Sequence, residues 1–342
     1  MEHAMRHFNK VLTTLFLAGF LLFLPFTLIA QAAKHARSFE FTYEAVLKNI
    51  PSTAHTVRIW IPIASSNPHQ AVKIIQKVVP VPARITRDPV FGNRMLYAVM
   101  KHPHSSTARF RIVYAVTRYE YSRGDYRNLM AYNRDPAKVP VRLVRYVQPD
   151  RLVPTGGVIA QIASETTQGK EGQIEKAFAL YNYVFHNMRY DKSGTGWGRG
   201  DALWACDAKH GNCTDFHSLF MALARAENIP TRFDIGFPLP QAAQGTIPGY
   251  HCWAEFYVQG LGWAPVDISE AWQNPSKHDF FFGSLDANRV LFSTGRDLML
   301  APKQDGPPVN YFVYPYIEVD GKVFDSVERR FSFRNLTVAE RH

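Results

Sequence analysis

The hydrophobic residues of this 342-residue chain change their spacing part-way along it, and that change limits the folds available. From Arg37 to about Arg123, short β-branched and aromatic runs alternate with Pro, Asn, Ser and Gly clusters, which is typical of strands and turns. Between Ile174 and Met188, apolar residues instead recur every three or four positions and indicate an amphipathic helix. The chain therefore combines a strand-rich first part with a mixed second part, and it is long enough for two domains.

This division separates three parts of the chain. Residues 37–125 are expected to form a small β-sandwich-like domain, and residues 126–155 form a polar, arginine-rich connector. Residues 156–334 are expected to form a second domain that contains both helices and strands. Within that second domain, Asp320-Gly321 predicts the turn of a hairpin.

The start of the chain has the features of an export signal. Arg6 and Lys10 stand next to an apolar run that ends at Ala30, and Ala30-Gln31-Ala32 has the small-x-small pattern of a cleavage site. We predict a signal peptide over residues 1–32, cleaved after Ala32, and hence a periplasmic or secreted protein. The alternative is an uncleaved inner-membrane anchor, because the run is about as long as a bilayer-spanning helix. In that case the signal segment is the expected contact with the membrane.

The formal net charge of +10 favours anionic partners such as envelope polymers. Arg and Lys are scattered, however, and no run resembles a nucleic-acid-binding arm. Nucleic acid is therefore not an expected partner, and a basic solvated surface is the simpler explanation of the charge.

Cys213 has the sequence context of a nucleophile. It opens a second helical segment, GNCTDFHSLFMALARA, and Gly211-Asn212 before it indicates a close backbone approach at a turn. Unpaired N–H groups and the positive end of the helix dipole favour a thiolate at such a position, and the thiolate is the attacking species. A buried structural cysteine is the alternative.

His251 and Asp267 are the expected base and orienting carboxylate. His251 opens the strand HCWAEFYV, and Asp267 closes the strand LGWAPVD. A three-residue loop at 258–260 would pair Tyr257 with Leu261 and place Gly260 in the left-handed conformation. In that register His251 lies directly opposite Asp267, which can accept a hydrogen bond from one imidazole nitrogen while the other faces the sulfur.

The remaining cysteines are expected to pair. Because side chains alternate along a strand, Cys252 should point away from His251 and from the reactive sulfur. In an oxidising compartment we predict a Cys206–Cys252 disulfide, which leaves Cys213 as the free thiol. Two buried free cysteines are the alternative.

A zinc site is the competing interpretation of the segment Cys206-x3-His210-x2-Cys213-x3-His217. Structural zinc ligands usually come as two pairs separated by a dozen residues, whereas these four crowd into twelve. We therefore predict no metal, with His217 packed beneath the site.

The oxyanion donors are the last components of the expected site. The backbone N–H of Cys213 is the first candidate donor. Tyr190 and Trp204 are candidates for a second donor or for the lining of the site, with simple packing as the alternative role.

Two segments, GNCTDFHSLFMALARAENIPTRFDIGF and HCWAEFYVQGLGWAPVD, resemble the transglutaminase-like superfamily. They are similar to its three blocks: Cys before a helix, then His-x-Trp, then Trp-x-Pro-x-Asp. The resemblance covers roughly Gly156 to Asp267 and is greatest to an exported bacterial branch with an N-terminal β-domain. It implies an α+β fold of papain-like type, in which helices pack on an antiparallel sheet, with Cys213, His251 and Asp267 as a catalytic triad. It also implies that the chain after Asp267 is a C-terminal extension of that domain.

The resemblance also implies an activity: a cysteine hydrolase or acyltransferase that acts on amide or peptide bonds, with hydrolysis preferred. The expected substrate is a protein or peptide, potentially of the cell envelope. No acidic loop resembles the calcium sites of the animal cross-linking enzymes, so no cofactor is expected. A non-catalytic envelope interaction module on the same fold is the alternative.

Overall fold

A computed structural model describes residues 35–135 and 138–337 of the chain. The predicted signal peptide lies outside these described residues. Within them, no helix combines the length and the hydropathy that crossing a membrane requires.

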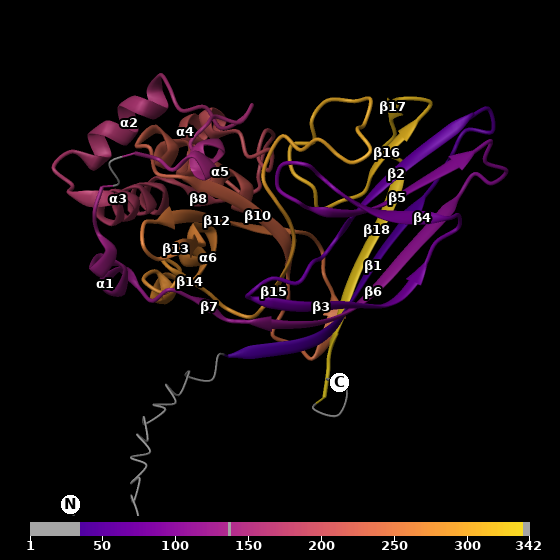
Figure 1. Cartoon of the computed structure of the whole chain (residues 1–342), viewed down its shortest axis with the longest axis horizontal. Helices are drawn as coiled ribbons and strands as arrows, with labels where there is room; N and C mark the ends of the chain where they lie inside the picture. The colour runs from indigo at the N-terminus through magenta and orange to yellow at the C-terminus, as the bar shows by residue number, and fades with distance from the viewer. Residues whose placement is uncertain (1–34, 136–137, 338–342) are drawn as a thin grey trace, which may run out of the picture. The chain divides into compact units, whose positions relative to one another are not determined.

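Two five-stranded antiparallel sheets form a β-sandwich (Figure 1). The first sheet has the order β11 (Gln244–Thr246), β18 (Val327–Asn335), β1 (Ala36–Leu47), β6 (Ala108–Tyr119) and β3 (Gln70–Val78). The second has the order β17 (Lys322–Val323), β16 (Tyr316–Val319), β2 (Thr56–Ile63), β5 (Arg94–Lys101) and β4 (Ala83–Arg87). Between the two sheets lies one apolar core, to which Phe41 of β1, Ile59 of β2 and Phe110 of β6 belong.

The C-terminal strands complete this sandwich, which corrects the predicted domain boundary. Strand β18 pairs with β1 from Phe39↔Asn335 to Leu47↔Val327, and β16 pairs with β2. The sequence instead predicts these strands in an extension of the second domain. The expected hairpin at Asp320-Gly321 is confirmed, because β16 and β17 pair across it.

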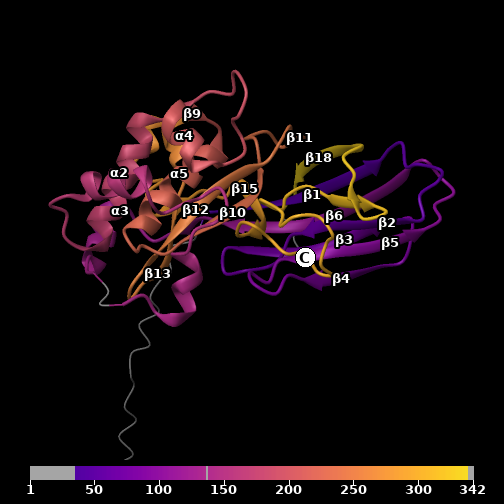
Figure 2. The same cartoon turned by 90° about the horizontal axis from the view of Figure 1, so that it is seen from above.

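The second part of the chain is a four-stranded antiparallel sheet with helices on it, in agreement with the expected α+β class (Figure 2). The order is β13 (Gly262–Val266), β12 (His251–Val258), β10 (Thr231–Pro238) and β15 (Arg289–Thr294). The predicted helices are α3 (Gly172–Asn187) and α5 (Cys213–Ala226), and α5 packs on β12 and β10. The other helices are α1 (Tyr126–Leu129), α2 (Val158–Thr167), α4 (Ala202–Ala208) and α6 (Ile268–Gln273).

Short elements join these parts. The connector contains two 3-10 turns, Met130–Tyr132 and Val141–Tyr146, and a third spans Pro275–Lys277. Two further strand pairs are β7 (Tyr121–Ser122) with β14 (Ser284–Leu285), and β8 (Arg189–Tyr190) with β9 (His210–Gly211).

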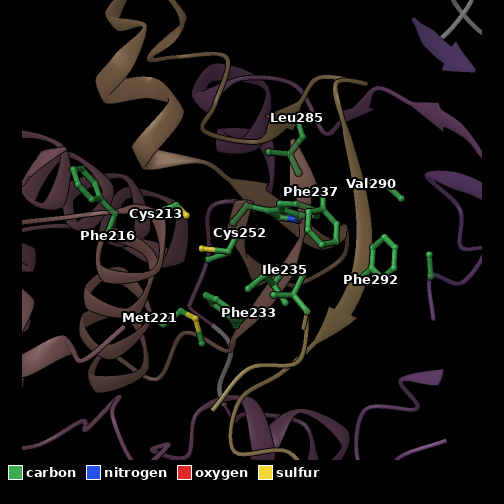
Figure 3. Packing of buried hydrophobic residues seen from close by; sticks show 14 of the residues in the cluster. Cys213, Phe216, Met221, Phe233, Ile235, Phe237, Cys252, Leu285, Val290 and Phe292 are labelled. Atoms are coloured by element: carbon green, nitrogen blue, oxygen red, sulfur yellow. The ribbon is translucent and has the colours of Figure 1, made fainter. Parts of the chain in front are cut away.

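Aromatic packing makes the core continuous from the helices into the sandwich (Figure 3). Phe216 of α5 and Phe233 of β10 belong to the same buried cluster as the sandwich strands. Further along β10, the ring of Phe237 lies 5.2 Å from the rings of both Phe41 and Phe292. A rigid, buried β10 therefore supports the neighbouring strand that begins at His251.

Candidate active site

A capping box fixes the start of helix α5 at Cys213. The Asn212 side chain accepts a hydrogen bond from the Thr214 N–H at 2.9 Å, and the Asp215 carboxylate accepts one from the Asn212 N–H at 2.9 Å. A side chain on Gly211 would overlap the Asp215 carboxylate, so the turn requires glycine there. The short segment GNCTD thus places the Cys213 sulfur at the positive end of a 14-residue helix.

The hairpin that carries His251 and Asp267 has the predicted loop length in a different register. Strand pairing runs from Val258↔Gly262 to Ala254↔Val266, and Gly260 has the expected positive φ of 85°. This register is displaced from the predicted one, so Asp267 is not directly opposite His251. The two residues still share a face, because the displacement moves Asp267 by an even number of positions relative to His251.

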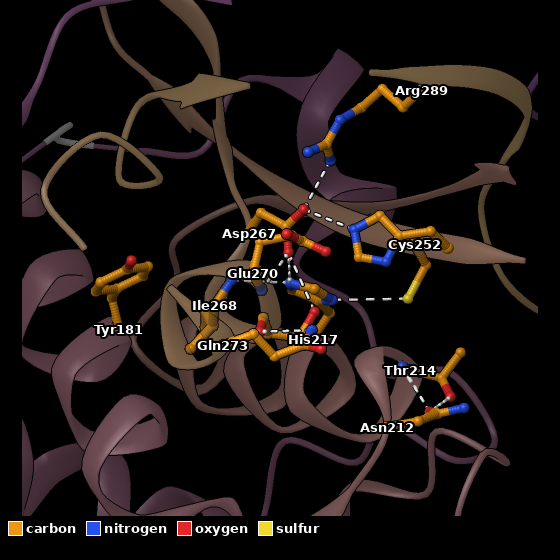
Figure 4. A network of polar contacts seen from close by, with 12 residues as sticks. Tyr181, Asn212, Thr214, His217, Cys252, Asp267, Ile268, Glu270, Gln273 and Arg289 are labelled. Carbon is orange, nitrogen blue, oxygen red and sulfur yellow. Dashed lines mark hydrogen bonds and ion pairs between the residues drawn. The ribbon is translucent and has the colours of Figure 1, made fainter. Parts of the chain in front are cut away.

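The Asp267 carboxylate is nevertheless in direct contact with the imidazole. His251 Nε2 lies 2.7 Å from Asp267 Oδ2, and Arg289 donates to the same oxygen at 2.7 Å (Figure 4). The other oxygen accepts from the Glu270 N–H and the Ser269 hydroxyl, both at 3.1 Å. Asp267 is fully buried, and these partners supply the hydrogen bonds that a buried carboxylate needs.

Electrostatics favours a thiolate–imidazolium pair. Burial raises the pKa of the Cys213 thiol, but hydrogen bonds with Cys252 and His251 and the imidazole charge outweigh it and hold the pKa well below its ordinary value. Burial lowers the pKa of His251, and the charge of Asp267 reverses the effect and raises that pKa well above its ordinary value. Because Nε2 of His251 is bound to Asp267, Nδ1 is the nitrogen left for the sulfur.

Cys252 joins the site instead of forming a disulfide, so the predicted Cys206–Cys252 bridge is wrong. All three cysteines are free thiols, and Cys206 is half-buried on α4. The sulfurs of Cys213 and Cys252 point toward one another (Figure 3), and we assign a hydrogen bond between them because each thiol shifts the pKa of the other. The expectation that Cys252 faces away from the reactive sulfur is therefore also wrong. Helix α5 packs on the face of β12 that carries the Cys252 side chain.

His217 fixes the direction of this hydrogen bond. Its Nε2 accepts from the Ile268 N–H at 3.1 Å, so the ring proton resides on Nδ1, which lies 3.6 Å from the Cys252 sulfur. Burial lowers the pKa of His217 to about 4, in agreement with a neutral ring. The 3.6 Å approach of Nε2 to Asp267 is accordingly not an ion pair. Cys252 accepts from His217 and is left to donate its own proton to Cys213.

The other predicted site residues lie at the margins. Tyr190, on β8, pairs with Gly211, and burial followed by the nearby Cys213 raises the pKa of its hydroxyl. Trp204, on α4, packs edge-on against the ring of His210 with centroids 5.2 Å apart. Among the described residues, no three His, Cys, Asp or Glu side chains are arranged to hold a metal ion. The segment Cys206 to His217 thus gives no support to the zinc interpretation.

Two neighbours were missed by sequence reasoning. The Tyr250 hydroxyl accepts from the Asn212 amide at 3.0 Å and lies 3.3 Å from the Thr214 hydroxyl, so it borders the Cys213 turn. Its position directly before His251 was an available signal. Arg289 follows Asp267 by 22 residues and had no local signal.

A thiol at a helix start, next to an imidazole held by a buried carboxylate, defines the core of a cysteine-type enzyme. Residues 160–268 match the family model of the transglutaminase-like superfamily, so this core is similar to that superfamily. The superfamily and the fold agree with those expected from the sequence.

Comparisons with individual proteins extend beyond the core. An uncharacterized protein of Haemophilus influenzae is 27% identical over 330 residues, which cover 86% of this chain and 88% of that protein. The structure of a candidate cysteine protease from Cytophaga hutchinsonii is similar over 89% of this chain and 92% of that one, with a TM-score of 0.61 and 16% identity. The structure of the periplasmic domain of TgpA from Pseudomonas aeruginosa bound to ethylmercury aligns with 72% of this chain and 94% of that domain, with a TM-score of 0.36 and 15% identity. The similarity to the Cytophaga hutchinsonii structure shows that the sandwich and the four-stranded sheet with its helices occur together in another protein.

Proposed function

We propose that this protein is an exported cysteine hydrolase or acyltransferase that acts on amide or peptide bonds of a protein or peptide substrate in the cell envelope. The observation that supports the enzyme is the contact of Cys213 with an imidazole whose other nitrogen lies 2.7 Å from a buried carboxylate. Export rests on the sequence of residues 1–32.

In the proposed reaction, the Cys213 thiolate attacks the carbonyl carbon, and the carbonyl electron pair moves to oxygen near the Cys213 N–H. His251 gives its Nδ1 proton to the leaving amine as the C–N bond breaks, which leaves a thioester on the sulfur. Water then attacks the thioester, passes a proton to His251 and releases the acid. An amine in place of water gives acyl transfer. Asp267 and Arg289 hold the ring throughout.

The pH dependence follows from the two displaced pKa values. The reactive pair exists between the lowered pKa of Cys213 and the raised pKa of His251. Turnover should therefore rise with pH as the thiol ionises, stay level across neutrality and fall as the imidazolium loses its proton. The rising and falling parts of the pH profile belong to the coupled Cys213–His251 pair and not to either residue alone.

Labelling with iodoacetamide at neutral pH tests the nucleophile. In the wild-type chain, Cys213 should be alkylated faster than Cys206 and Cys252, and Cys213→Ala should abolish the fast phase. Cys206→Ala is the matched control, because Cys206 is a free thiol on a different helix. Equal labelling rates at the three thiols, with a Cys213 that titrates at its ordinary value, would favour the non-catalytic interaction module.

Release of ammonia or amine from envelope peptides tests the reaction itself. Wild-type protein should release it, Cys213→Ala should not, and added hydroxylamine should divert the acyl group to a hydroxamate. Turnover that survives Cys213→Ala would overturn the proposal.

A further inference from the structure

A groove of about 660 Å³ lies at the edge of the first sandwich sheet. Its lining includes Val327, Arg329 and Phe331 of β18, together with Arg111, Pro248 and Tyr314. We call it the edge groove. Its volume lies within the range typical of ligand sites.

The backbone of β18 is open where it lines the edge groove. Strand β11 covers only the last part of β18, and the coverage ends where the Ile247 N–H donates to the Phe331 carbonyl at 2.9 Å (Figure 2). That bond shows that odd-numbered residues of β18 turn their backbone groups outward, because N–H and C=O of one residue share a side in an antiparallel strand. The outward N–H and C=O of Arg329 have no hydrogen-bond partner within 35–135 and 138–337.

Two arginines of the edge groove form no ion pair with another described residue: Arg329, and Arg111, which donates a hydrogen bond to the Gln76 side chain. Glu44 and Arg330 also line the groove, and they pair with Arg109 and Glu328 respectively. The Arg329 guanidinium lies 4.7 Å from the centre of the Tyr314 ring. A ligand here would meet an open strand edge and unpaired positive charge.

Two residues that line the edge groove are connected to the candidate active site. The Tyr314 ring lies 5.9 Å from the Tyr250 ring, and the Tyr250 hydroxyl accepts from Asn212 beside Cys213. Pro248 is three positions before His251 in the chain. The edge groove is thus connected to the Cys213 turn through ring and hydrogen-bond contacts and to His251 through the chain itself.

We propose that the edge groove binds an extended acidic peptide segment of the substrate, which pairs with Arg329 of β18 as an added strand and offers carboxylates to Arg111 and Arg329. This substrate class rests on the proposed function, since it assigns the acyl donor of the same site. Main-chain pairing supplies affinity without regard to sequence, and the arginines select acidic side chains. The stretch from Val327 to Arg330 is about 13 Å long and suits four peptide residues. The Val327 N–H already donates to the Asp325 carbonyl at 2.8 Å, so the N–H and C=O of Arg329 are the main groups left for an added strand.

Binding of fluorescein-labelled hexaglutamate to the full mature chain carrying Cys213→Ala tests this groove by anisotropy. Arg329→Gln and Arg111→Gln should each weaken binding about threefold to fivefold, and together more than tenfold. Lys77→Gln, an exposed cation on β3 outside the edge groove, is the charge-matched control and should leave binding unchanged. Hexaglutamine should bind more weakly than hexaglutamate.

Strand pairing has its own test. Hexaglutamate with alternate N-methylated peptide bonds keeps its charge but loses half of its backbone N–H donors. It should bind at least tenfold more weakly than unmodified hexaglutamate. Equal binding of the methylated peptide, or of an acidic oligosaccharide such as oligogalacturonate, would overturn strand pairing. Unchanged binding in the double arginine variant would overturn the edge groove as the site.

Protection of Cys213 from alkylation tests the link between the edge groove and the sulfur. Saturating hexaglutamate should slow alkylation of Cys213 in the wild-type chain and leave alkylation of Cys206 unchanged. Binding without protection would overturn the connection. A groove that binds the peptide in a chain whose Cys213 is unreactive would overturn the enzyme and leave the binding site standing, so the two failures are distinguishable.

Discussion

Replacing Cys252 with alanine should raise the pKa of the Cys213 thiol. Cys252 donates its thiol proton to the Cys213 sulfur, because the His217 Nδ1–H already occupies its acceptor side. Removing a donor from a thiolate destabilises the charged form, so ionisation shifts to higher pH.

The size of the shift follows from the kind of bond. Hydrogen bonds to charged groups contribute about 1.5–3 kcal/mol, and a thiol is a weak donor, so the lower end applies. At 1.36 kcal/mol per pKa unit, the expected rise is about one unit. Cys252→Ser keeps a hydroxyl donor in nearly the same place and should leave the pKa of Cys213 close to that of the parent.

The assay is the rate of alkylation of Cys213 by iodoacetamide as a function of pH, followed by mass analysis of the peptide that contains it. A Cys206→Ser background leaves Cys213 and Cys252 as the only thiols. The small void in Cys252→Ala costs about 1 kcal/mol of stability, which lowers the melting temperature without moving the titration midpoint. An unchanged midpoint in Cys252→Ala, or equal shifts in the Ala and Ser variants, would refute the assigned hydrogen bond.

Three further changes test other parts of the structure. Asp267→Asn should reduce amide turnover about 100-fold or more while binding persists, because the ring loses its charged partner; a kcat within threefold of the parent would argue against the orienting role. Arg225→Met removes one of the two arginines paired with the buried Asp150, 2.6 Å away, and should lower the free energy of unfolding by about 3 kcal/mol in urea, the lower end for a broken buried pair because Arg145 remains; a loss below 1 kcal/mol would contradict it. Burial raises the pKa of Glu255 to about 8, so the folded state keeps a proton that the unfolded chain releases above its ordinary pKa. The melting temperature should therefore fall between about pH 5 and pH 8 in the parent, and less steeply in Glu255→Gln.

Local signals predicted the helix start at Cys213, the candidate nucleophile, because its environment is local. Asn212 and Asp215 bracket Cys213 within four residues, and their capping box sets the helix start without help from distant strands. The helices were equally predictable from the sequence, because the apolar periodicity of α3 lies within its own residues. The hairpin loop was predictable from Gly260, although the register moved once the strands were paired.

Partners that are far apart in the sequence could not be read from it. Arg289 reaches Asp267 only because β15 lies beside β10 in the sheet, and β18 reaches β1 across almost the entire chain. Alternation places Cys252 and His251 on opposite faces of β12 but does not say which face a helix covers. Because α5 covers the face of Cys252, its sulfur lies beside His217 and contributes to the site.

One segment connects the sandwich to the imidazole. Its first residues, Gln244–Thr246, extend the sandwich sheet as β11, Ile247 and Pro248 then line the edge groove, and β12 begins at His251. A ligand that pairs with β18 would therefore contact Ile247 and Pro248, which belong to the same chain segment as His251. Cys213 is only 2% exposed, so a substrate must be guided to it and cannot collide with it from open solvent. We therefore propose that the sandwich forms part of the substrate site: β18 would supply the strand edge that an extended chain needs, and β11 leads directly to the strand that begins at His251.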